Sequence, residues 1–84
     1  MTNSVSAPET LEKGRMAGGL DLQELWLECF AMGFNGSVGR LQDILDGTER
    51  LSRSEYDLIA QCLNERLREA GDSELVPYAD EIDL

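Results

Sequence analysis

Cys29 and Cys62 are the two thiols of this 84-residue chain, and the chain contains no histidine. A pair of thiols could form a redox-active disulfide or bridge two copies of the chain. They are not spaced as Cys-x-x-Cys, and a structural zinc ion needs about four Cys or His ligands. Each cysteine lies among apolar residues of a predicted helix, which favours two reduced, buried thiols. The redox pair and the intermolecular bridge remain as alternatives.

Carboxylates are the other abundant reactive groups, with 17 Asp and Glu residues against 7 Lys and Arg. Paired carboxylates perform acid–base catalysis, but no pair here has a spacing that sets it apart from a solvated helix surface. The region of Asp43, Asp46 and Glu49 lacks the spaced Asp, Gly and Glu pattern of a calcium loop. We therefore expect no catalytic residue, no metal site and no cofactor, and a protein that is not an enzyme.

Ser37 is a candidate site of covalent modification because it opens a predicted helix. In this respect an acidic, all-helical chain of this length resembles acyl and peptidyl carrier proteins, where such a serine takes a phosphopantetheine arm. The resemblance implies that Ser37 would be the modified residue. The sequence departs from that family in two ways: Ser37 does not stand in an Asp-Ser-Leu type motif, and the loop before it is short.

The formal net charge of −10 indicates which partners the chain attracts. Residues 1–19 are balanced, residues 20–71 carry ten acids and five Arg, and residues 72–84 carry five acids and no base. The negative electrostatic field of these carboxylates attracts a basic protein surface and repels the phosphates of nucleic acid. Six Arg and one Lys also favour a prokaryotic source with a GC-rich genome.

Nucleic-acid binding is the alternative function. The two helices predicted on either side of residue 50 have the outline of a helix-turn-helix, with Arg50 and Arg53 where a recognition helix would meet base edges. Glu55 and Asp57 at the same helix start, and the overall negative charge, count against this interpretation.

The elements that hold these residues are predicted by caps and apolar periodicity. Ser52 and Glu55 form a capping-box pair, as do Asp21 and Glu24, and Ser37 can cap a third helix. Glycines follow the three expected helices, where a left-handed residue ends a helix well. We expect an all-α fold with a three-helix domain over residues 20–71, built from helices at about 22–32, 38–46 and 53–70.

The two ends of the chain look different from this domain. Residues 1–19 are mostly small, polar and charged, so we expect a disordered, flexible N-terminal arm. Residues 72–84 form an acidic, extended tail in which apolar residues alternate with carboxylates. No apolar run is long enough for a membrane span and no signal segment opens the chain, which favours a cytoplasmic protein.

Function is therefore expected on surfaces. Apolar residues cover more than half the circumference of the helix at 22–32, so this helix is either the centre of the bundle or partly an interface. The tail could dock in a basic groove of a partner, or Val76, Pro77 and Tyr78 could fold back over the bundle, and both can hold at once with Tyr78 packed and residues 80–84 free. We expect a regulatory or adaptor protein, dimeric, that binds a basic partner such as a transcription factor or sigma-type subunit. The candidate contact residues are Trp26, Leu27, Phe34, Tyr78, Asp80, Glu81, Ile82, Asp83 and Leu84.

Overall fold

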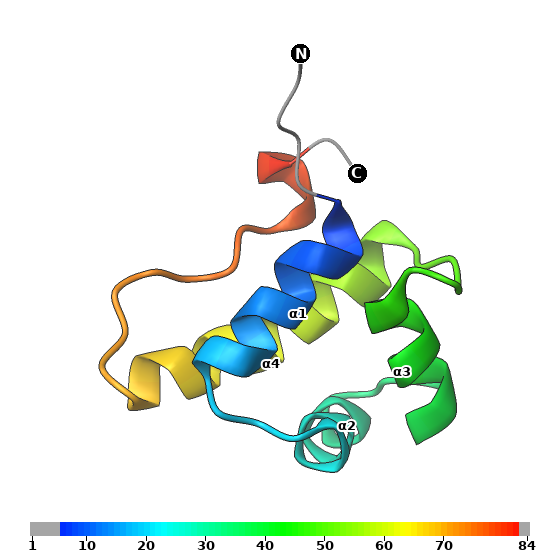
Figure 1. Ribbon diagram of the computed structural model, residues 1–84, viewed down its shortest axis with the longest axis horizontal. Coiled ribbons are helices and arrows are strands. Elements are labelled where there is room, and N and C mark those ends of the chain that lie inside the picture. The colour runs from blue at the N-terminus through cyan, green and yellow to red at the C-terminus, as the bar shows by residue number, and fades with distance from the viewer. Residues whose placement is uncertain (1–5, 83–84) are drawn as a thin grey trace.

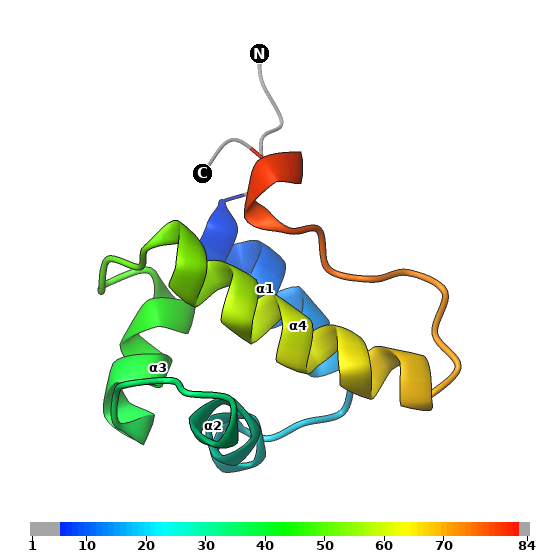
Figure 2. The same cartoon turned by 180° about the vertical axis from the view of Figure 1, so that it is seen from behind.

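The computed structural model describes residues 6–82, which form an all-α domain of four helices and one short 3-10 helix. The radius of gyration is 11.9 Å. Figures 1 and 2 show the arrangement from two sides. The elements are α1 (Ala7–Ala17), α2 (Leu22–Ala31), α3 (Val38–Asp46), α4 (Arg53–Glu69) and η1 (Ala79–Glu81).

Capping residues set the helix starts that the sequence predicts. The Ser52 hydroxyl accepts a hydrogen bond from the Glu55 amide at 3.1 Å, and the Glu55 carboxylate accepts one from the Ser52 amide at 3.1 Å. Asp21 and Glu24 form the same reciprocal pair at the start of α2. These bonds satisfy amides that have no partner within the helix. The predicted all-α class and the three helices over residues 20–71 are confirmed.

Helix α1 is the main correction to the predicted fold. Residues 6–17 belong to the segment expected as a disordered arm, yet they form a capped helix that packs against α3 and α4. Ser6 and Glu9 make a further capping box, with Pro8 in the first turn, where its missing amide hydrogen costs nothing. Leu11 of α1 is fully buried in the core, and the sequence pattern of residues 1–19 did not reveal this contact with distant residues. Residues 1–5 lie outside the described part of the chain.

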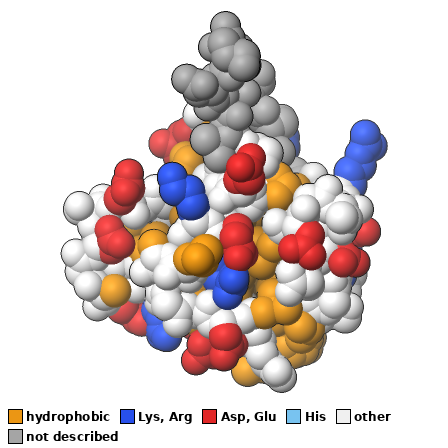
Figure 3. Space-filling view, viewed as in Figure 1, with side chains coloured by type: hydrophobic (Ala, Val, Ile, Leu, Met, Phe, Trp, Pro, Cys, Tyr) orange, Lys and Arg blue, Asp and Glu red, His pale blue; other side chains and the backbone are white. Residues whose placement is uncertain are grey.

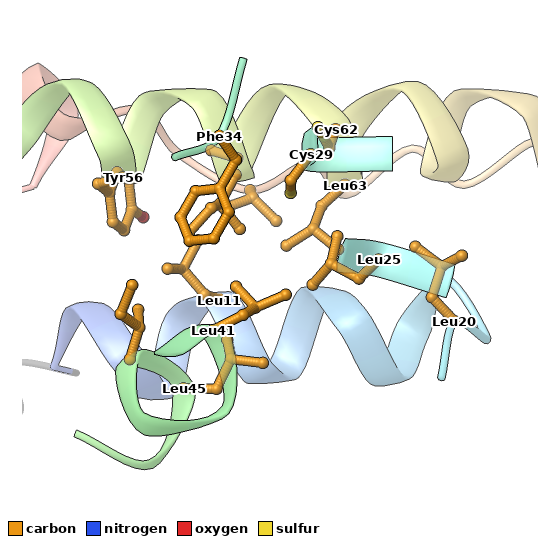
Figure 4. Close-up of a cluster of buried hydrophobic side chains, with 14 of the residues drawn as sticks. Leu11, Leu20, Leu25, Cys29, Phe34, Leu41, Leu45, Tyr56, Cys62 and Leu63 are labelled. Atoms are coloured by element: carbon orange, nitrogen blue, oxygen red, sulfur yellow. The ribbon is translucent and has the colours of Figure 1, made fainter. Parts of the chain in front are cut away.

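Helix α4 is the centre of the molecule, because α1, α2 and η1 all pack against it. Seven of its residues are buried, whereas α2 has two buried residues. Figure 4 shows side chains from every α-helix converging on this core, with Leu11 and Leu41 facing Leu63 across it. Helix α2 contacts both α3 and α4, as expected of the helix at 22–32, but α4 is the more central element because α1 and η1 also pack against it.

The tail folds back along α4 and is fixed there by side chains. Gly71 adopts a φ of 77°, which turns the chain at the end of α4 at little steric cost. The Asn64 side chain then binds both backbone groups of Val76, and the Tyr56 hydroxyl donates to the Pro77 carbonyl at 2.9 Å. Asp57 accepts a hydrogen bond from the Ala79 amide at 2.7 Å. The structure therefore shows the tail folded back over the bundle as far as residue 82, the last residue that it describes.

Candidate partner-binding surface

The outward face of α2 exposes large apolar side chains. Phe30 is 59% exposed and Leu27 is 53% exposed, whereas Leu25 and Cys29 on the opposite face are fully buried. With about 3.6 residues per turn, Leu27 and Phe30 share the face that points away from α3 and α4. Figure 3 shows hydrophobic side chains gathered along the lower edge of the molecule, where α2 lies in Figure 1. We call the surface formed by Trp26, Leu27 and Phe30 the α2 face.

Trp26 holds the aromatic part of the α2 face in place. Its indole N–H donates to the Gly36 carbonyl at 2.8 Å, which ties the ring to the loop before α3. The Phe30 ring stacks on this indole, with 5.1 Å between centroids and 23° between planes. An aromatic side chain fixed in this way loses little conformational freedom on binding, so it suits an interaction anchor.

The charge on α2 is entirely negative. Its sequence contains Glu24 and Glu28 and no Lys or Arg. Helical spacing puts Glu24 next to Leu27, three residues further on, whereas Glu28 lies on the side of α2 that is near Cys62. This arrangement complements a surface that combines apolar side chains with Lys or Arg.

The predicted contact residues fall into three groups in the structure. Leu27 is exposed and Trp26 is half-buried, so both remain on the surface. Phe34 is only 3% exposed and lies under the Arg40 guanidinium, 5.7 Å from the ring centroid, so it is not an exposed anchor. Phe34 follows the end of α2, and a hydrogen bond from its amide to the Cys29 carbonyl turns it back to the core.

The tail residues are distributed between the core and the surface. Tyr78 and Ile82 are half-buried and pack against the core, whereas Asp80 and Glu81 are exposed. Asp83 and Leu84 lie outside the described residues. The structure does not bring the tail candidates together with the α2 face, because they are attached to α4 by different contacts.

Phe30 is the exposed aromatic residue of the α2 face that the sequence did not single out. It lies four residues after Trp26, a spacing at which side chains on a helix meet, and that spacing was the available signal. The apolar residues of α2 are so numerous that periodicity alone does not show which of them face solvent.

Arg50 and Arg53 lie at the connection between α3 and α4, and both are exposed. Arg40 is also near this connection, but it forms ion pairs with Glu55 at 2.8 Å and Glu49 at 3.3 Å. These carboxylates reduce the positive charge that a phosphate would meet. Nucleic-acid binding stays a prediction from the sequence.

Other reactive groups offer less specific sites. A pocket between α1 and the tail is lined by residues that include Lys13 and Glu74. Its volume of about 200 Å³ is smaller than that of typical small-molecule sites. Ser37 uses its hydroxyl as the N-cap of α3. Within residues 6–82, no group of three or more His, Cys, Asp or Glu side chains is placed to hold a metal ion.

Cys29 and Cys62 are free, fully buried and adjacent, one on α2 and the other on α4. Their hydrogen bond and the burial of the thiol raise the pKa of Cys29, so this group is protonated at neutral pH. The expectation that both thiols are buried is confirmed. Their adjacency is new information, because their positions in the sequence do not imply it.

Comparisons with known proteins found no match to a protein-family model, to a curated protein or to a solved structure. In the part of the chain that the structure describes, no helix is both long and apolar enough to cross a membrane.

Proposed function

We propose that this chain is a small, non-enzymatic regulatory or adaptor protein that binds a basic protein partner through the α2 face. The observation that carries the proposal is the exposed Phe30 ring, stacked on a Trp26 that is itself hydrogen-bonded to the Gly36 carbonyl. Aromatic side chains held in place on a surface are typical of the residues that dominate binding free energy at interfaces.

Charge supports a basic partner over a second copy of the chain. The formal net charge of −10 repels an identical molecule, and Glu24 lies next to Leu27 of the α2 face. A segment with apolar residues on one side and Lys or Arg on the other would match both features. Such a segment could belong to a transcription factor or a sigma-type subunit of a prokaryotic cytoplasm, which is the setting we propose.

A defined peptide tests the proposal directly. The probe is an amphipathic helical peptide of Leu and Lys, and its control is a scrambled peptide of the same composition and charge. Trp26 is the single tryptophan, so its fluorescence reports binding at the α2 face. We expect the amphipathic peptide to bind more tightly than the scrambled one, with an affinity that falls as salt rises.

Two matched variants distinguish binding at the α2 face from binding by general charge attraction. Phe30→Ala should weaken binding of the amphipathic peptide by about tenfold or more. Leu75→Ala removes an exposed apolar side chain from the tail without changing the charge, and should leave binding unchanged. Equal binding of both peptides, or equal effects of both substitutions, would contradict the proposal.

Sedimentation of the full chain tests the dimer that the sequence predicts. A dimer that Phe30→Ala dissociates would identify a second copy as the occupant of the α2 face and would overturn the basic partner. A monomer, or a dimer that survives this substitution, leaves the α2 face free for the partner that we propose.

A further inference from the structure

Three sulfur atoms meet at the junction of α2 and α4. The Cys62 thiol donates a hydrogen bond to the Met32 thioether, with 3.2 Å between the sulfur atoms, and Cys29 lies beside Cys62. The chain has two cysteines and three methionines, so more than half of its sulfur is in this cluster. We call Cys29, Met32 and Cys62 the sulfur cluster.

The helix geometry explains how the cluster forms. Cys29 and Met32 are three residues apart at the end of α2, so their side chains leave the helix on the same side. That side faces α4, where Cys62 is fully buried. Two thiols and a thioether are therefore held together by elements that the core already fixes.

The cluster is also open to solvent at one point. Cys29 and Cys62 are fully buried, but Met32 is 38% exposed and its sulfur touches that of Cys62. The carboxylates of Glu28 and Glu65 act on Cys62 through space, so a cation approaching this point is attracted. A flexible methionine side chain can move to admit an ion and then bind it.

We propose that the sulfur cluster is a binding site for a soft monovalent metal ion, Cu(I). Thiolate and thioether ligands select Cu(I), and a cluster without imidazole or carboxylate donors is a poor match for harder ions. Structural zinc needs four ligands, one more than the cluster supplies. On binding, the two S–H bonds break and their protons pass to solvent, two Cu–S bonds form, and Met32 adds its sulfur without losing a proton. Copper stays Cu(I), and no electron is transferred.

The test is a titration of the full, reduced chain with Cu(I) in the absence of oxygen and in the presence of the chelator bathocuproine disulfonate. We expect one ion per chain, release of protons, and a near-ultraviolet thiolate-to-copper absorption band. Zn(II) in place of Cu(I) should bind much more weakly. Failure of the chain to compete with the chelator, or equal retention of Zn(II), would overturn the proposal.

Two methionine variants supply the matched comparison. Met32→Leu keeps the size and apolar character of a partly exposed side chain, so the fold should survive, and the affinity for Cu(I) should fall about tenfold. Met16→Leu changes a methionine that is 69% exposed on α1 and should have no effect. Cys62→Ser should abolish binding, with circular dichroism to establish that the variant is folded. Retention of Cu(I) by Met32→Leu with the affinity of the unmodified chain would refute the three-sulfur site.

Discussion

The side-chain amide of Asn64 binds both backbone groups of Val76. Its oxygen accepts a hydrogen bond from the Val76 amide at 2.6 Å, and its nitrogen donates to the Val76 carbonyl at 3.0 Å. Asn64 is 1% exposed, so its polar side chain lies in the core. This pairing attaches the tail to α4 and satisfies polar groups that would otherwise be buried without partners.

Asn64→Ala should therefore destabilise the protein strongly. It removes both hydrogen bonds and leaves the Val76 groups unpaired, at a cost of about 2 to 4 kcal/mol in the free energy of unfolding. Urea denaturation measures this cost, and hydrogen exchange of the Val76 amide should become faster. Gln61→Ala changes an exposed residue of the same helix and should cost less than about 0.5 kcal/mol. Similar effects of the two substitutions would show that the tail is not held by Asn64.

Tyr56→Phe tests the second attachment of the tail through its pH dependence. Burial, with the charges of Asp57 and Glu81, raises the pKa of Tyr56 to about 12. Because the folded-state pKa exceeds the ordinary value of 10.0, this group contributes stability that is complete below pH 10 and is lost as pH rises toward 12.

We expect Tyr56→Phe to cost about 1 kcal/mol near neutral pH, through loss of the hydrogen bond to Pro77, and to weaken the alkaline decline in stability. Urea denaturation of both proteins across this pH range measures the difference. An alkaline decline of equal size in the two proteins would count against the role of Tyr56.

Leu11→Ala tests whether α1 belongs to the folded domain. Leu11 is fully buried in the core, so its truncation should lower the free energy of unfolding by about 2 to 5 kcal/mol. Met16→Ala, at an exposed position of the same helix, should change it by less than about 0.5 kcal/mol. Thermal denaturation distinguishes the two, and a flexible arm would give the same small effect for both substitutions.

Gly14→Ala and Gly39→Ala form a matched pair of helical glycines. Alanine favours a helix by up to about 1 kcal/mol over glycine. At Gly14 the new Cβ would lie 2.5 Å from the Val76 Cγ2, whereas at Gly39 the nearest atom is the Ser37 Oγ at 3.7 Å. We expect Gly39→Ala to stabilise the protein and Gly14→Ala to destabilise it by about 1 to 3 kcal/mol, as measured by urea denaturation. Stabilisation by Gly14→Ala would show that Val76 packs more loosely than the structure indicates.

Arg40→Gln tests the ion pair between α3 and α4. The hydrogen bond from Arg40 lowers the pKa of Glu55 below its ordinary value of 4.5, against the opposing effect of burial. The stability from this pair is therefore complete above pH 4.5 and is lost as the pH falls through the lowered pKa. The difference in unfolding free energy between the unmodified protein and Arg40→Gln should shrink as the solution is acidified.

Arg68→Gln, at an exposed position near the end of α4, provides the control for charge alone. Its effect on stability should be small and should not depend on Glu55. NMR titration of the Glu55 carboxylate should show its pKa rising in Arg40→Gln and staying in place in Arg68→Gln. A Glu55 pKa that is the same in all three proteins would disprove the coupling.

Local signals explain why the predicted helix limits agree with the structure. The caps at Asp21, Ser37 and Ser52 act through amides within three residues, so the sequence alone reveals them. Helix α1 carried the same signal in Ser6 and Glu9, but its apolar residues were too few for periodicity to support it. Helix α1 packs against α3 and α4, with Leu11 buried in the core, and these are tertiary contacts.

The all-α class, the limits of α2, α3 and α4, and the negative charge of the chain could all be predicted from the sequence, because these properties depend on neighbouring residues or on composition. The burial of Phe34, the exposure of Phe30 and the position of Cys29 beside Cys62 became evident from the folded chain alone. The two phenylalanines are equally apolar, and their exposure depends on where α3 and α4 pack against α2. That packing joins residues far apart in the chain, so no local pattern reveals it.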